Sequence, residues 1–187
     1  DSDKEQFLIS IGSTSEIIAG PVDGSSYQFW FIPALNRITI QHGVKNTSEG
    51  ATSGKTKAVM TVSYEIPEKF VLEVGTREAK YDNGDPYGRE VYIKIDGQEV
   101  ASWRDKEAGN RLLGENIICY ANKMSVTFKS LSGRYLIRDD VKVNDLYDTS
   151  REISMLAASG VNTSLGTMKT VNNAFKAEVS FAKTDSD

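Results

Sequence analysis

The chain has 187 residues, of which 39% are hydrophobic and 26% are charged, and its net charge is −4. This size and composition predict a single globular domain over residues 1–187 with a full apolar core. The 22 Lys and Arg residues are scattered along the chain, which argues against nucleic acid and anionic membrane surfaces as partners, because both need a concentrated positive surface. No apolar stretch is long enough to insert across a membrane.

Short runs that alternate apolar and polar residues predict β-strands through the first half of the chain. These runs lie at residues 7–11, 27–32, 37–41, 57–64 and 70–75. The run Y-Q-F-W-F-I at 27–32 is aromatic on both sides, so we expect it to be covered on both faces, with Trp30 packed in the core. Polar segments at 43–54 and 80–88 predict loops that could form the rims of a binding site.

The central feature is a predicted β-hairpin at residues 89–104, which read R-E-V-Y-I-K-I-D-G-Q-E-V-A-S-W-R. Asp96-Gly97 predicts a two-residue type I′ turn, because this turn needs positive φ at both central positions. Counting outward from the turn gives the expected register. The expected pairs are Ile95 with Gln98, Lys94 with Glu99, Ile93 with Val100, Tyr92 with Ala101 and Glu90 with Trp103.

That register predicts one apolar face, made of Val91, Ile93, Ile95 and Val100. The other face carries Tyr92 and Trp103 as diagonal neighbours, beside an expected ion pair between Lys94 and Glu99. Sugars present apolar C–H faces that stack on aromatic rings. The candidate ligand-binding residues are therefore Tyr92, Trp103, Lys94, Glu99 and Arg104. If a loop or helix covers this face, both rings are core residues instead, and the sequence leaves the two alternatives open.

Further strands are predicted at 117–120, 124–129, 135–137 and 175–181. One segment favours a helix. Thr149-Ser-Arg-Glu152 has capping-box spacing, Ile153, Leu156 and Ala157 share a helical face, and Gly160 is placed to end it. The fold class is therefore all-β, a two-sheet antiparallel β-sandwich of jelly-roll type with one short helix near 150–159.

Cys119 is the only cysteine, which excludes an intrachain disulfide. It lies in an apolar run and is expected to be an inert core thiol. Asn46 and Asn162 begin Asn-Thr-Ser sequons, which are candidate glycosylation sites in a secreted protein and could also occur by chance. The chain begins at Asp1 without a Met, which fits a trimmed chain or a secreted chain whose signal peptide has been removed.

Asp82, Asn83 and Asp85 form a candidate metal site in the segment D-N-G-D-P. They bring hard oxygen ligands together on a turn, as calcium prefers. The same residue types also favour an ordinary solvated turn, so both readings stay open. His42 is the only histidine, and because no nucleophile motif accompanies it, a catalytic histidine is disfavoured.

Three segments in order resemble the late strands of concanavalin A-like jelly-roll domains. These segments are V-Y-I-K-I-D-G-Q-E-V-A-S-W-R-D (91–105), L-G-E-N-I-I-C-Y (113–120) and V-T-F-K-S-L (126–131). The group includes laminin-G-like modules, many glycan-binding domains and the 3-keto-disaccharide hydrolase domain. The resemblance implies a sandwich whose concave face or loop rim holds a glycan, often near a calcium ion. Glycan-cleaving members of the laminarinase-like branch carry an E-x-D-x-x-E strand that this chain lacks, which argues against a hydrolase.

The leading functional hypothesis is a non-catalytic, secreted, lectin-like protein that binds carbohydrate or another extracellular ligand. The alternative is a structural or adhesion protein of an extracellular matrix, shell or viral surface, which contacts other proteins and assembles as a homo-oligomer. A glycan-active enzyme is the least favoured reading.

Overall fold

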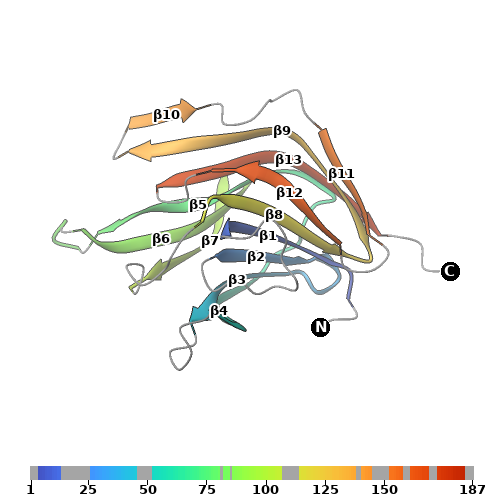
Figure 1. Cartoon of the computed structure of the whole chain (residues 1–187), viewed down its shortest axis with the longest axis horizontal. Coiled ribbons are helices and arrows are strands. Elements are labelled where there is room, and N and C mark those ends of the chain that lie inside the picture. The colour runs from blue at the N-terminus through green and yellow to red at the C-terminus, as the bar shows by residue number, and fades with distance from the viewer. Residues whose placement is uncertain are drawn as a thin grey trace.

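The computed structural model describes ten segments of the chain. They are residues 4–13, 26–45, 52–80, 82–84, 86–106, 114–137, 140–144, 152–157, 161–168 and 172–183. Within these segments the chain forms two antiparallel β-sheets (Figure 1). The predicted all-β antiparallel β-sandwich is therefore confirmed.

The first sheet, called sheet A, has six strands. In spatial order they are β12 (Val161–Thr167), β8 (Asn116–Asn122), β1 (Gln6–Ser13), β2 (Tyr27–Ile32), β3 (Arg37–Lys45) and β4 (Thr52–Ser63). A 3-10 turn, η1 (Pro33–Leu35), connects β2 to β3 and ends at Asn36 in the left-handed conformation. Strand β4 forms one edge of sheet A.

The second sheet, called sheet B, has seven strands. In spatial order they are β10 (Asp140–Asn144), β9 (Met124–Ile137), β13 (Asn173–Lys183), β5 (Lys69–Lys80), β6 (Pro86–Ile95) and β7 (Gln98–Asp105), with β11 (Glu152–Ala157) paired to β9. Several strands are longer than predicted. Residues 135–137 are the end of β9, and strands extend into both ends of the expected 43–54 and 80–88 loops.

The helix predicted near 150–159 is wrong, because residues 152–157 form strand β11. Each residue of β11 pairs with β9, and Ile153 lies opposite Phe128. Glu152 and Ser154 are exposed while Ile153 is buried, which is the alternation of a strand. A capping box states only a local preference, and sheet pairing that buries Ile153 overrides it. No helix in the described segments is long and apolar enough to cross a membrane.

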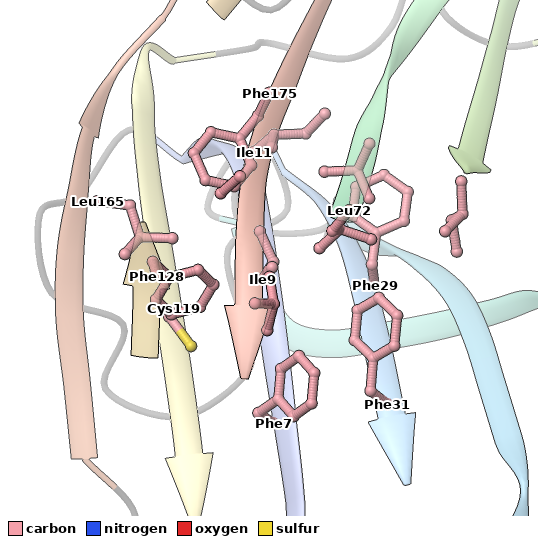
Figure 2. Packing of buried hydrophobic residues seen from close by; sticks show 14 of the residues in the cluster. Phe7, Ile9, Ile11, Phe29, Phe31, Leu72, Cys119, Phe128, Leu165 and Phe175 are labelled. Carbon is pink, nitrogen blue, oxygen red and sulfur yellow. The ribbon is translucent and has the colours of Figure 1, made fainter. Parts of the chain in front are cut away.

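The core lies between the two sheets and is built from the inward-facing residue of each alternating pair. Figure 2 shows side chains from β1, β2, β5, β8, β9, β12 and β13 meeting there. Phe7 and Phe31 stack with ring centroids 4.7 Å apart. Cys119 is fully buried in this cluster, as predicted, and burial raises the pKa of its thiol well above the ordinary value.

The central hairpin forms, but its predicted register holds only next to the turn. Ile95 pairs with Gln98 and Lys94 with Glu99, whereas Ile93 pairs with Ala101. Val100 is therefore the extra residue of a β-bulge. Because side chains alternate with a period of two, this one-residue shift moves every later side chain of β7 to the opposite face. Trp103 consequently lies opposite Val91 and not opposite Glu90.

Candidate functional site

The predicted Tyr92 and Trp103 platform is wrong, because the bulge puts the two rings on opposite faces of sheet B. Trp103 faces inward, packs against the core and stacks on His42, with ring centroids 5.5 Å apart and an interplanar angle of 21°. Tyr92 stays on the outer face but is only 2% exposed. The two rings therefore share no surface on which a sugar could stack, and Tyr92 is too buried to contact one.

Neighbouring side chains enclose the ring of Tyr92. The guanidinium carbon of Arg77 lies 4.6 Å from the ring centroid, and Nζ of Lys94 lies 5.6 Å from it. Tyr92 is opposite Gly75, which in turn is opposite Ala174. A Cβ on Gly75 would collide with backbone atoms of β13. The position therefore requires glycine, and the ring of Tyr92 is held by two cations.

The charges around Tyr92 are paired with one another, and we call them the ion-paired surface. Its residues are Glu73, Arg77, Glu90, Lys94 and Glu99. Arg77 is 2.6 Å from Glu99 and 3.2 Å from Glu90, while Lys94 is 3.7 Å from Glu73. The expected Lys94–Glu99 ion pair is therefore replaced by pairs that each residue makes with β5.

Titration of this surface follows from the pairing. Partial burial would raise the pKa of Glu90, but hydrogen bonds and charge attraction from Arg77 outweigh burial and lower it. Burial likewise opposes the charge of Arg77, and its hydrogen bonds to Glu90 and Glu99 outweigh that effect and raise its pKa. The ion-paired surface is thus satisfied internally.

An open hollow of about 550 Å³ lies on the outer face of sheet A, and we call it the cross-strand groove. Its lining includes Gln6, Trp30, Arg37, Gln41, Tyr120 and Asn122. These residues come from β8, β1, β2 and β3, and Ala58 and Thr61 of β4 complete the far side. The groove therefore runs across the strands and not along them.

The register of β8, β1 and β2 places two aromatic side chains at the centre of the groove. Tyr120 is opposite Leu8, and Leu8 is opposite Trp30. The rings of Trp30 and Tyr120 meet edge to face, with centroids 6.0 Å apart and an interplanar angle of 68°. Leu8, the residue between them, has no exposed surface. Both rings are half-buried, so each keeps part of its surface open to the groove.

Amide groups border the aromatic pair on both sides. Gln6 is opposite Asn122, whose Nδ2 donates to the Lys4 carbonyl at 3.4 Å. On the other side Gln41 Nε2 donates to Gln28 Oε1 at 2.6 Å. Amides both donate and accept, so these groups suit hydroxyl-bearing ligands. The hydrogen bonds hold the amides in fixed positions before a ligand arrives.

A tryptophan at position 30 has a cost in folding free energy, and packing alone does not explain why the residue is there. Its indole N–H is buried and has no acceptor among the described residues. An unsatisfied buried donor costs about 1–3 kcal/mol, and phenylalanine would avoid that cost. The prediction that Trp30 is a core residue is wrong. The signal that could have corrected it is that Gln28, on the same side of β2, is polar.

A second hollow of about 430 Å³ opens between the edge strands β4 and β7, and we call it the seam pocket. Its lining includes His42, Lys57, Trp103, Arg104, Asp105 and Lys106. The Tyr27 hydroxyl donates to Asp105 at 2.6 Å and accepts from Arg89 at 3.2 Å. Burial, and next the hydrogen bond to Asp105, raise the pKa of Tyr27 well above its ordinary value.

The predicted calcium and glycosylation sites stay predictions. Asp82 and Asn83 are exposed in a turn, and Asp85 lies outside the described residues. No cluster of three or more metal-binding side chains occurs in the part of the chain that the structure describes. Asn162 is half-buried on β12 opposite Tyr120, while Asn46 lies outside the described residues.

Comparison with family models, with curated proteins and with solved structures found no match to this chain. The resemblance to concanavalin A-like domains therefore stays a prediction.

Proposed function

We propose that the chain is a non-catalytic carbohydrate-binding β-sandwich of the extracellular environment and that the cross-strand groove is its binding site. The observation that carries the proposal is the pair Trp30 and Tyr120, half-buried at the centre of the groove and bordered by amides. The proposed aromatic platform is therefore on sheet A and not on the hairpin of sheet B.

The chemistry of the groove suits a sugar ring. The C–H face of a pyranose stacks on an aromatic ring, and the edge-to-face angle of 68° lets Tyr120 form a wall beside Trp30. Hydroxyl groups on the rim of the sugar would reach Gln6, Asn122 and Gln41, which offer both donors and acceptors. A few fixed polar groups around an apolar surface are the usual composition of a ligand site.

The dimensions favour an oligosaccharide over a single sugar. The groove crosses the sheet from β8 to β4, which is four inter-strand spacings and so roughly 19 Å. Glycoside cleavage ordinarily needs a pair of carboxyl groups. The described lining of the groove supplies rings, amides, hydroxyls and one guanidinium and contains neither Asp nor Glu, which supports binding over hydrolysis.

The test is a titration of the full chain with a panel of soluble neutral oligosaccharides, with and without calcium, followed by calorimetry and tryptophan fluorescence. The chain has two tryptophans, so Trp103→Phe leaves Trp30 as the only indole reporter. We expect saturable binding that this variant retains, within about twofold. Trp30→Ala should lose at least about 30-fold in affinity, equal to about 2 kcal/mol, as a central aromatic contact does.

Melting curves of both variants control for unfolding. Equal affinity in Trp30→Ala and the parent chain would contradict the proposal, as would a panel without any binding. In the latter case the structural or adhesion alternative gains, and sedimentation should then reveal a size that increases with protein concentration.

A further inference from the structure

The seam pocket is the direct neighbour of the cross-strand groove. Ala58 of edge strand β4 lines both hollows. An oligosaccharide that runs through the groove across β4 therefore leaves sheet A at the mouth of the seam pocket. The two hollows can bind successive parts of one extended ligand.

Two aromatic side chains, His42 and Trp103, line the seam pocket. His42 and Trp103 stack at 5.5 Å across the space between the two sheets. His42 Nδ1 donates to the Gly43 carbonyl at 2.6 Å, which fixes the orientation of the imidazole ring.

The accessible charge of the pocket is positive, although the chain as a whole carries −4. Lys57 and Lys106 line the pocket, are exposed, and have no ion-pair partner among the described residues. Arg104 also lines it but lies near Glu90. The lining carboxylate, Asp105, is 1% exposed and accepts the Tyr27 hydroxyl, so it offers little charge to a ligand.

We propose that the seam pocket binds an acidic sugar, with the carboxylate of a uronic acid residue facing Lys57 and Lys106. The ligand class of the whole site is then an acidic polysaccharide. This inference rests on the proposed function, because the groove must hold the neighbouring sugars.

The test compares one oligosaccharide in two charge states. Each neutral member of the panel is oxidised at its primary hydroxyls, which converts the CH₂OH groups to carboxylates and keeps the backbone. We expect the oxidised form to bind about tenfold more tightly at low salt, with a gain that shrinks at high salt. Trp103 fluorescence should respond to the oxidised form, because this indole lines the seam pocket.

The decisive variant is Lys57→Gln/Lys106→Gln, which should lose the tenfold gain and keep the affinity for the neutral form. Its matched control is Lys69→Gln/Lys129→Gln, which removes the same charge from a separate hollow on sheet B and should keep the gain. If neutral sugars bind and oxidation adds nothing, or if both double variants lose the gain equally, the inference is overturned and the proposed function stands. If neither form of any sugar binds, both are overturned.

Discussion

The outer faces of the two sheets are both polar, and both carry aromatic residues, yet they differ in what their neighbours leave open. On sheet B, Tyr92 is 2% exposed beneath Arg77 and Lys94, and the nearby carboxylates pair with those cations. On sheet A, Trp30 and Tyr120 are half-buried, and a hollow of about 550 Å³ lies above them. An aromatic residue on an outward strand position is thus not by itself a binding platform.

The difference comes from what stands beside each ring. Arg77 of β5 and Lys94 of β6 lie beside Tyr92 and have long charged side chains, which cover its ring. The residues beside Trp30 are Leu8 and Thr39, which are too short to reach over an indole. Cross-strand neighbours, and not the aromatic residue itself, decide whether a ring is available to a ligand.

The largest expected effect is a loss of folding stability when the aromatic residue on the outer face of sheet B is removed. Tyr92→Ala should destabilise the fold by about 3–4 kcal/mol, because it empties a space enclosed on all sides. Groove binding should be unchanged within error. Chemical unfolding measures the first effect and calorimetry with the best-binding sugar the second. A variant that kept its stability but lost binding would return the site to the hairpin and break the comparison.

Tyr120→Ala is the counterpart on sheet A and should show the opposite pattern. We expect an affinity loss of about tenfold, or 1.4 kcal/mol, because the wall beside Trp30 is removed. Stability should fall by less than in Tyr92→Ala, because Tyr120 is only half-buried. Titration calorimetry and unfolding curves on the two variants together test this reversal. If both variants lost stability but kept their sugar affinity, the role of Tyr120 would be structural, namely to shield Leu8 from solvent.

Much of the fold could be predicted from the sequence because β-strands with one buried face alternate. The strand at 27–32 begins and ends as expected, and its inward residues Tyr27, Phe29 and Phe31 are in the core. The helix prediction failed because the capping box is a local signal, whereas the pairing of β11 with β9 is made by residues more than twenty positions away.

The candidate site on sheet A could not be predicted from the sequence for a related reason. The bulge at Val100 reverses the face of Trp103, and no residue in the hairpin sequence marks it. Trp30 and Tyr120 are brought together through β1, which lies between their strands. Their contact depends on the order of strands in sheet A, and local periodicity contains no information about that order.

A smaller loss of stability is expected when one ion pair of the ion-paired surface is broken. Glu90→Gln should cost about 1 kcal/mol at neutral pH. The pKa of Glu90 is lowered in the folded chain, so the unfolded chain binds the proton more tightly. Its stabilisation is therefore complete above about pH 4.5 and is lost as the pH falls through the lowered value. In unfolding experiments, the difference in stability between parent and variant should therefore disappear as the pH falls through the lowered pKa of Glu90.

The matched control is Glu152→Gln, which breaks a 3.6 Å pair with Lys129 in which both side chains are more than half exposed. An exposed pair of this kind contributes little, so this variant should match the parent chain at neutral pH. Equal costs in the two variants would mean that the partial burial of Glu90 adds nothing.

The smallest expected effect on stability bears directly on why position 30 is a tryptophan. Trp30→Phe removes apolar area, which costs stability, and also removes the buried N–H that lacks an acceptor, which restores it. The two terms are of similar size, so we expect the free energy of unfolding to change by less than about 1 kcal/mol. Sugar affinity should still fall, about threefold, because phenyl offers a smaller stacking face. A residue retained for packing would show the reverse, a clear loss of stability with unchanged binding. The ratio of these two changes therefore distinguishes a binding residue from a structural one at the centre of the groove.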